Sequence, residues 1–357
     1  MKKLKIKKFG VLNLIALCVL VLVLSAIPTA GLVIKKNNDI KENFFGEASL
    51  LQGVLEIWNI DTFEAGTDSK ESYLATLAST FEEENKGTYV VIKNITPAEL
   101  EINLAEGKHP DLYSFGYGLG EKLASSLSPL ELSMWLPENI TNSSLCDGKL
   151  LSVPFMVGGY LVISSAEKLA EAQKPEDTNL LAEIDNLGYT KTLRKKSVEV
   201  KSAIYGDSGF TSAVTVLAQN GITVSKAEKF GDGYNAYMNY MSLGKSTALI
   251  GSQRDLARIL HKRSLGKLEE GFVFAPVGGY TDLIQSMGIC RFSDELKQQY
   301  AKKFLEFCLT ETNQKRLSSI GMFSVLAVKL YEEGEFAVLE DSLKQNLRLA
   351  DIYKKIQ

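Results

Sequence analysis

Apolar and polar positions follow one another in a pattern that predicts strands and helices in turn along the chain. Val54–Ile60 is a short apolar run of the kind found in buried strands. In Ser72–Glu84 apolar residues recur at spacings of three and four, which predicts a helix with one buried face. Tyr89–Ile95 is rich in β-branched residues and predicts a second strand, and Asp111–Phe115 predicts a third.

A helix is expected between the second and third strands. Thr96 suits the N-cap, Pro97 suits the first helical position, and Glu99 completes the spacing of a capping box. The helix is expected to end near Gly107. Strands that alternate with helices in this way run parallel, with right-handed crossovers and helices on both faces of the sheet.

The same alternation recurs in the second half of the chain, so the fold class is α/β. From Asp294 to the end we expect a chain that is almost wholly helical, with a break near Gly321–Val325. The earlier elements expected in this half are strands at Val200–Tyr205, Thr247–Ile250, Phe272–Pro276 and Gln285–Arg291, and helices at Thr211–Asn220, Ala227–Leu243 and Gln253–Arg263.

The N-terminus combines a lysine cluster with a long segment that has no charged side chain. Five lysines lie within residues 1–8, and the uncharged segment is Phe9–Ile34. Such a segment is long enough to cross a hydrocarbon core of about 30 Å, with the lysines on the cytoplasmic side. We therefore expect residues 1–34 to be a signal peptide or a transmembrane anchor, residues 35–52 to be a tether, and the remainder to work outside the cell.

The sequence leaves open whether this segment is cleaved. Leu24–Ala26 and Pro28–Ala30 are both poor cleavage sites, and the apolar run continues beyond them. Lipid attachment at Cys18 is not expected, because Leu17 is too large for the position before a lipidated cysteine.

Composition argues against several classes of function. The formal net charge is −3 and becomes more negative without the lysine-rich leader, and Arg194–Lys196 is a short basic cluster, so no nucleic-acid partner is expected. The chain has two histidines and four cysteines without a CxxC pair, which leaves little material for a metal site or a histidine-based triad. We expect no cofactor and no metal. The length beyond the leader favours two lobes over one core.

Two glycine-containing motifs do not support nucleotide binding. Gly244-Lys245-Ser246 lacks the glycine of a phosphate-binding loop, because Asn239 stands at that position, and it follows a predicted helix instead of a strand. Gly116–Gly120 follows a strand but lacks the spacing of a dinucleotide-binding fingerprint, so it predicts a sharp turn. Paired carboxylates of a glycoside hydrolase remain an alternative, although no two acidic residues stand out.

Four stretches, taken in order, resemble the extracellular solute-binding proteins of ABC importers, in the sugar- and oligosaccharide-binding group that includes maltose-binding proteins (family 1). The stretches are Val54–Asn59, Gly107–Phe115, Ser152–Ile163, and Ala301–Phe307 with Gln314 and Gly321. Together they extend over nearly all of residues 50–325. No single motif is specific; the order of the four carries the resemblance.

The resemblance implies a two-lobe, periplasmic-binding-protein-like fold of type II, with parallel-rich sheets flanked by helices. It implies one lobe from residues 53–157 and 277–320 and another from residues 158–276 and 321–357. Crossings between the lobes are expected near 157–161, 274–289 and 321–325, and the lobes would close over a ligand by a hinge. The ligand would then lie at the carboxyl ends of the parallel strands.

Sugar recognition combines aromatic platforms with Asp, Asn, Gln or Ser side chains. Core packing is an open alternative for Trp58 and for Phe115. Gly158-Gly159 and Gln253 stand where relatives carry larger side chains, which leaves a different or larger ligand open. The predicted ligand-binding residues, all at strand ends or crossings, are Trp58, Asn59, Asp61, Phe115, Tyr117, Tyr160, Tyr205, Ser252 and Gln253.

We therefore expect a monomeric receptor on the extracellular face of the bacterial cytoplasmic membrane, held by its N-terminal segment or secreted. It would capture a carbohydrate or similar polar solute, deliver it to an ABC permease and perform no covalent chemistry. A membrane-anchored sensor of the same fold is the alternative, and a surface glycosidase is a third.

Overall fold

The computed structural model describes residues 53–268 and 271–354, all of which belong to one unit of the chain. The predicted leader (1–34) and tether (35–52) lie outside the described residues. Within the described ranges, no helix combines the length and the apolar character needed to cross a membrane.

The first sheet contains the three strands predicted from the N-terminal half. Its order is β2-β1-β3-β14-β6, and β1 pairs in parallel with both β2 and β3. The strand β14 is antiparallel to β3 and to β6, so the sheet is mixed, with its parallel part confined to the first three strands. The bounds are β1 (Gly53–Ile60), β2 (Thr88–Asn94), β3 (Leu112–Gly116), β14 (Ile284–Ile289) and β6 (Val153–Val157).

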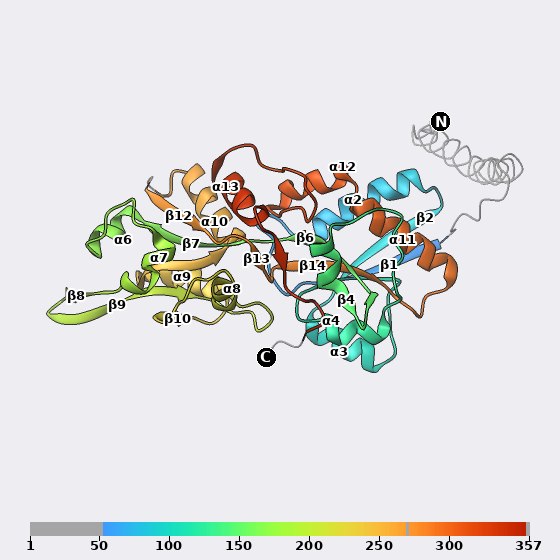
Figure 1. The fold of residues 1–357 in the computed structure, drawn as a ribbon, viewed down its shortest axis with the longest axis horizontal. Helices are drawn as coiled ribbons and strands as arrows, with labels where there is room; N and C mark the ends of the chain where they lie inside the picture. The colour runs from blue at the N-terminus through green and yellow to red at the C-terminus, as the bar shows by residue number, and fades with distance from the viewer. Residues whose placement is uncertain (1–52, 269–270, 355–357) are drawn as a thin grey trace, which may run out of the picture. The chain divides into compact units, whose positions relative to one another are not determined.

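Helices cover both faces of this sheet (Figure 1). The helix α2 (Lys70–Glu84) buries Leu74, Leu77 and Phe81, as its apolar spacing predicts. On the same side, the Phe81 ring meets Phe304 of α11 (Glu295–Cys308) edge-on, with ring centroids 5.2 Å apart. The helix α3 (Pro97–Ala105) begins with the predicted capping box.

Short elements complete this part of the chain. They are α4 (Gly120–Leu123), η1 (Ala124–Ser126), α5 (Glu138–Thr141), η2 (Asn142–Ser144), β4 (Leu145–Cys146), β5 (Lys149–Leu150), α12 (Glu311–Lys315) and η4 (Arg316–Ile320).

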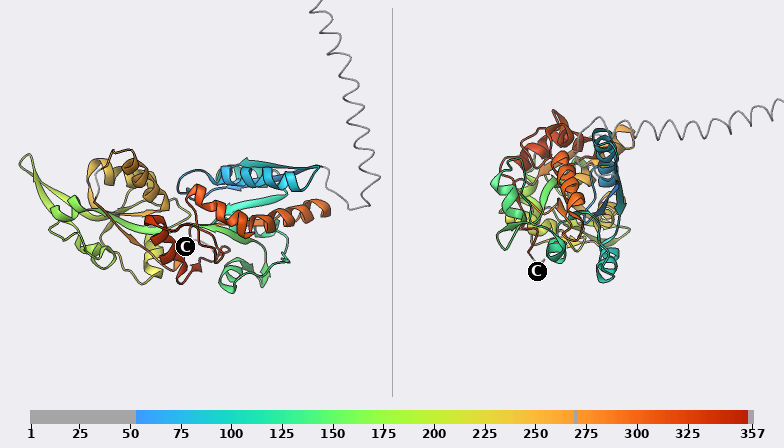
Figure 2. Two further views of the ribbon diagram at one scale, coloured as in Figure 1. Left: turned by 90° about the horizontal axis from the view of Figure 1, so that it is seen from above. Right: turned by 90° about the vertical axis from the view of Figure 1, so that its right-hand side faces the viewer.

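The second sheet repeats the same plan. Its order is β10-β9-β11-β7-β12, with β10, β9 and β11 parallel and with β7 antiparallel to β11 and β12. The strand β8 forms a hairpin with β9 that extends from the end of this sheet (Figures 1 and 2). The bounds are β7 (Tyr160–Ser165), β8 (Tyr189–Leu193), β9 (Lys196–Tyr205), β10 (Ala227–Lys229), β11 (Ser246–Ser252) and β12 (Phe272–Pro276).

The helices around the second sheet carry several of the groups discussed below. They are α6 (Ala166–Glu171), α7 (Leu180–Glu183), η3 (Ile184–Asn186), α8 (Ala213–Gln219), α9 (Gly233–Leu243), α10 (Gln253–Ser264) and α13 (Gly334–Lys344). A two-stranded sheet of β13 (Tyr280–Thr281) and β15 (Arg348–Leu349) lies beside them.

Two sequence predictions were wrong in these regions. The helix expected at Ala227–Leu243 begins only at Gly233, because Ala227–Lys229 extends the sheet beside β9 and Asp232 caps the helix. The C-terminal region is also less helical than expected. Phe323 pairs with Val157, and β15 pairs with β13, so backbone hydrogen bonds to the crossing segments replace helix there.

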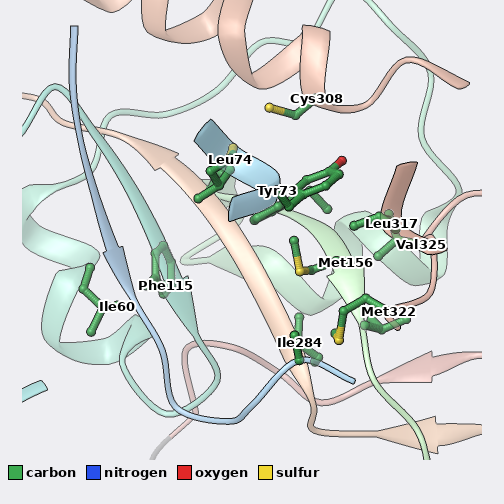
Figure 3. Packing of buried hydrophobic residues seen from close by; sticks show 14 of the residues in the cluster. Ile60, Tyr73, Leu74, Phe115, Met156, Ile284, Cys308, Leu317, Met322 and Val325 are labelled. Atoms are coloured by element: carbon green, nitrogen blue, oxygen red, sulfur yellow. The ribbon is translucent and has the colours of Figure 1, made fainter. Parts of the chain in front are cut away.

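The segments that connect the two sheets are hydrogen-bonded to one another. Val157 and Phe323 exchange two backbone hydrogen bonds of 3.0 Å, and the Gly158 amide donates to Leu283 O at 2.7 Å. Apolar side chains of the same region, including Met156, Ile284 and Met322, form one core with α2 (Figure 3). The connections are therefore packed parts of the core.

A close backbone contact at Gly321 yields a test of this packing. Gly321 and Gly107 have nearly the same φ, 66° and 69°, so alanine at either position should cost about 1–2 kcal/mol for the left-handed backbone. A Cβ at Gly321 would lie 2.8 Å from Gly66 Cα, whereas a Cβ at Gly107 meets nothing within 4 Å.

We expect Gly321→Ala to lower the free energy of unfolding by about 1–3 kcal/mol more than Gly107→Ala, because backbone atoms cannot move aside as a side chain can. Denaturant titration of the two variants measures the difference. Equal losses would show that the contact between residues 66 and 321 is not tight.

Candidate functional site

A cavity of about 470 Å³ lies where β1, β9 and β11 end at their carboxyl termini. One wall is the loop Asp61–Glu64, which follows β1 of the first sheet. The other wall comes from the second sheet and its helices, and its residues include Gly206, Ser208, Thr211, Asp232–Tyr234, Gly251, Ser252, Asp255 and Arg258. Its size falls in the range of about 300–1,000 Å³ that is usual for small-molecule sites. Its position matches the rule that parallel sheets bind ligands at the carboxyl ends of their strands.

A buried lysine holds the first wall in place. Lys70 is fully buried, and its Nζ donates to Phe63 O at 2.7 Å, to Gln285 Oε1 at 3.1 Å and to Asp61 Oδ1 at 3.3 Å. The same Nζ lies 3.5 Å from the centroid of the Phe63 ring. Burial lowers the Lys70 pKa, and Asp61 opposes this shift. These contacts fix the loop between residues 61 and 63 from beneath.

The second wall is built on the first turns of two helices. Asp232 caps α9, with Oδ1 accepting the Asn235 amide at 2.8 Å. Ser252 caps α10 in a capping box, in which Asp255 Oδ2 accepts the Ser252 amide at 3.1 Å. Burial raises the pKa of Asp255 to about 6, although hydrogen bonds from Ser252 and Arg258 oppose the shift. Tyr234 follows Asp232 and is 54% exposed.

The helix α10 also reaches the first wall. Arg258 Nη1 donates to Asp255 at 2.9 Å, and Arg258 Nη2 donates to Glu64 Oε2 at 2.8 Å. Arg254 Nη1 donates to Gly66 O and Thr67 O, both at 3.0 Å. One helix of the second sheet thus contributes to the cavity and binds the loop that forms the opposite side.

A buried carboxylate without an ion-pair partner in residues 53–268 and 271–354 lies behind the cavity. Asp282 Oδ1 accepts the Tyr160 hydroxyl at 3.0 Å, and Oδ2 accepts the Ser212 amide at 2.7 Å. Burial raises the pKa of Asp282 to about 7, and the nearby Asp207 adds to the shift. Asp282 therefore ties the segment between β13 and β14 to β7 and to the start of α8.

Three of the residues predicted from sequence line the cavity: Asp61, Tyr160 and Ser252. Asp61 lies at the end of β1, Tyr160 begins β7, and Ser252 ends β11. Whether they contact a ligand stays a prediction, as it does for the other six.

Trp58, Asn59 and Phe115 are buried and are not among the residues that line the cavity. Trp58 Nε1 donates to Glu56 Oε1 at 2.6 Å, and its ring meets Tyr113 edge-on at 6.0 Å. The Asn59 amide is held by Asp61 and Asn94. Phe115 belongs to the core (Figure 3). These positions match the alternative of core packing for Trp58 and Phe115.

Tyr117, Tyr205 and Gln253 also lie off the cavity wall. Tyr117 packs against the larger hydrophobic core and Tyr205 against the smaller one. Gln253 is fully buried, and its Nε2 donates to Glu64 O at 2.9 Å while its Oε1 accepts the Gly159 amide at 3.1 Å. Gln253 therefore links α10 to the loop that follows β1.

Sequence reasoning missed most of the other residues on the walls, among them Phe63, Glu64, Asp232, Tyr234 and Arg258. The pair Asp232-Gly233 carried a signal, because Asp is a preferred N-cap residue. The helix predicted from Ala227 placed Asp232 in its interior, where an N-cap is not expected. Arg258 sits in mid-helix, and only the fold brings it to Glu64.

No known family matches the sequence, and no curated protein does. Solved structures do match. CpMnBP1 with mannobiose bound is 14% identical, with a TM-score of 0.54 over 84% of this chain and 90% of that one. The ABC substrate-binding protein Lmo0181 from Listeria monocytogenes in complex with cycloalternan is 13% identical, with a TM-score of 0.56 over 84% and 89%.

The sugar-binding protein MalE from the phytopathogen Xanthomonas citri is 14% identical, with a TM-score of 0.55 over 83% of this chain and 86% of that one. Two of these structural neighbours are thus solved with a saccharide bound, one of them an ABC substrate-binding protein, and the third is a sugar-binding protein. The likeness establishes the fold: two mixed sheets flanked by helices, in the arrangement of periplasmic binding proteins.

The Asp282 site predicts a pH dependence of stability with a definite sign. The pKa of Asp282 is about 7 when folded and about 4 in the unfolded chain. Between these pH values the folded form keeps a proton that the unfolded form has released, so the free energy of unfolding falls as pH rises through this window. Asp255, with its pKa raised to about 6, contributes with the same sign.

Asp282→Asn carries no such proton, so we expect a shallower fall between pH 4 and pH 7. Urea titrations across this range measure the slope. Asp294→Asn, which changes an exposed N-cap residue of α11, should keep the original slope. If Asp282→Asn kept it too, the carboxyl of Asp282 would not be the titrating group.

Proposed function

We propose that this chain is the solute-binding receptor of an ABC importer and that it captures a carbohydrate or similar polar solute between its two lobes. The observation that carries the proposal is the cavity at the carboxyl ends of the strands of both sheets. It is supported by the fold shared with proteins solved with mannobiose and with cycloalternan. An ABC permease is the proposed partner that receives the solute.

The side chains on the cavity wall suit a sugar. Phe63 and Tyr234 place an aromatic ring on the first and on the second wall, where the apolar face of a sugar ring would pack. The carboxylates of Asp61 and Asp232 would accept hydrogen bonds from sugar hydroxyls. Binding would need no covalent chemistry, and we propose that the protein performs none.

Release and capture require the lobes to move apart and together. We propose the lobe boundaries implied by the sequence, residues 53–157 with 277–320 and residues 158–276 with 321–357, as the two moving bodies. The leader (1–34) would place them on the extracellular face of the cytoplasmic membrane, as an anchor or as a signal peptide. A monomer is sufficient for this role.

The experiment that tests the proposal is a thermal-shift screen of the full-length chain, purified in mild detergent, against neutral mono- and oligosaccharides, amino acids and glycerol phosphodiesters. A solute that binds only the folded form raises the melting temperature, so we expect at least one saccharide to do so. A response confined to amino acids would contradict the carbohydrate assignment. Turnover of a chromogenic glycoside would contradict the absence of catalysis.

Tyr234 supplies the aromatic surface of the second wall, and Tyr234→Ala should weaken solute binding about three- to tenfold through lost stacking. Tyr89→Ala is the matched control, because Tyr89 is similarly exposed, at 62%, but lies on β2 away from the cavity. Isothermal titration calorimetry with the best solute from the screen measures both. Equal affinities of the two variants would place the solute elsewhere.

A further inference from the structure

Acidic side chains outnumber basic ones on the cavity wall. The lining contains the carboxylates of Asp61, Glu64, Asp232 and Asp255, and a single cation, Arg258. Asp61 and Glu64 lie on the first wall, whereas Asp232 and Asp255 lie on the second, and Arg258 bridges Glu64 and Asp255. A cavity whose walls share one sign of charge concentrates solutes of the opposite sign.

The cations of this region are already engaged by protein groups. Arg258 donates to both Asp255 and Glu64, and Lys70 is buried against Asp61, Gln285 and the carbonyl of Phe63. Arg254 is directed to the carbonyls of Gly66 and Thr67 and lies 3.6 Å from Glu64. An anionic solute would therefore have to compete with existing ion pairs.

Two carboxylates on opposite walls keep an oxygen that no hydrogen bond within residues 53–268 and 271–354 occupies. Asp232 uses Oδ1 for the helix cap, and its carboxylate makes no ion pair within those residues. Asp61 uses Oδ1 for Asn59 and Lys70. The remaining oxygens can only accept hydrogen bonds, so the solute has to supply donors.

A second polar group of the first wall has no partner of its own. The Thr62 hydroxyl is buried, with its residue only 5% exposed, and it has no hydrogen-bond partner in the described ranges. Thr62 lines the cavity between Asp61 and Phe63. A buried hydroxyl without a partner is costly unless a ligand or water satisfies it.

We propose that the cavity selects a saccharide that carries a protonated amino group over the same saccharide with a hydroxyl or a carboxylate in its place. The inference rests on the proposed function and assigns the solute class. The ammonium group would be held by the free carboxylate oxygens of Asp232 and Asp61, and the sugar ring would pack on Phe63 or Tyr234.

The test uses matched sugars and the full-length chain in mild detergent. Glucose, glucosamine and glucuronate form one set, galactose, galactosamine and galacturonate a second, and cellobiose with the β-1,4-linked glucosamine disaccharide a third. Calorimetry should give an amine form that binds at least about tenfold more tightly than its hydroxyl form, as expected for one charge-assisted hydrogen bond. The preference should shrink as salt is raised, because exposed charges are screened.

Two substitutions at N-cap positions test whether Asp232 causes the preference for the amine. Asp232→Asn keeps a good cap for α9 but loses the charge, and it should reduce the preference for the amine about tenfold. Asp294→Asn makes the same change at the N-cap of α11, where Oδ1 accepts the Lys297 amide at 2.9 Å, and it should leave the preference unchanged.

Each outcome bears on the inference separately from the proposed function. If hydroxyl and amine forms bind equally, or if a uronate binds best, the inference is overturned while the receptor function stands. If no sugar of the three sets binds but another saccharide of the wider screen does, the inference is again overturned and the function stands. If no saccharide binds at all, both fall.

Discussion

The backbone contacts between the segments that connect the two sheets are the constraint on which the site depends. Val157 pairs with Phe323, and Gly158 receives contacts from the next connection through Leu283 O and the Thr281 hydroxyl. Because these segments are hydrogen-bonded to one another, the ends of β1, β9 and β11 are brought to face the same cavity. Strand pairing alone would not bring these ends together, since the two sheets share no strand.

Ionisable side chains whose burial costs free energy lie around this junction. Lys70 is buried beneath the first wall, Asp255 beneath the second, and Asp282 behind Tyr160. Burial lowers the pKa of Lys70 and raises the pKa of Asp255 and of Asp282, so it favours the neutral form of each group. The hydrogen bonds to these groups offset this desolvation cost only in part. Such local costs are typical of functional regions, and here each one fixes a segment that borders the cavity.

Much of the fold could be predicted because its signals are local. The spacing of Leu74, Leu77 and Phe81 identified α2, and Thr96 with Glu99 marked the start of α3. Prediction was wrong where pairing with a distant strand decided the structure. Ala227–Lys229 became a strand because the edge of β9 was available, and Phe323 became extended because Val157 lies beside it.

The candidate site was harder to predict, because strand ends can be recognised in a sequence but side-chain directions cannot. Asp61, Tyr160 and Ser252 lie at strand ends and line the cavity. Trp58 and Phe115 lie close to them in sequence, yet both are packed in the core. The most informative case is Gln253, whose side-chain amide occupies the space that a side chain at Gly158 would fill. Gln253 Oε1 lies 2.6 Å from the place where a Cβ on Gly158 would stand. The glycine and the glutamine therefore form one contact, and neither enlarges the cavity. Because Gln253 and Arg254 bind the loop that follows β1 while Asp255 and Arg258 border the cavity, a single helix, α10, joins one wall of the cavity to the other.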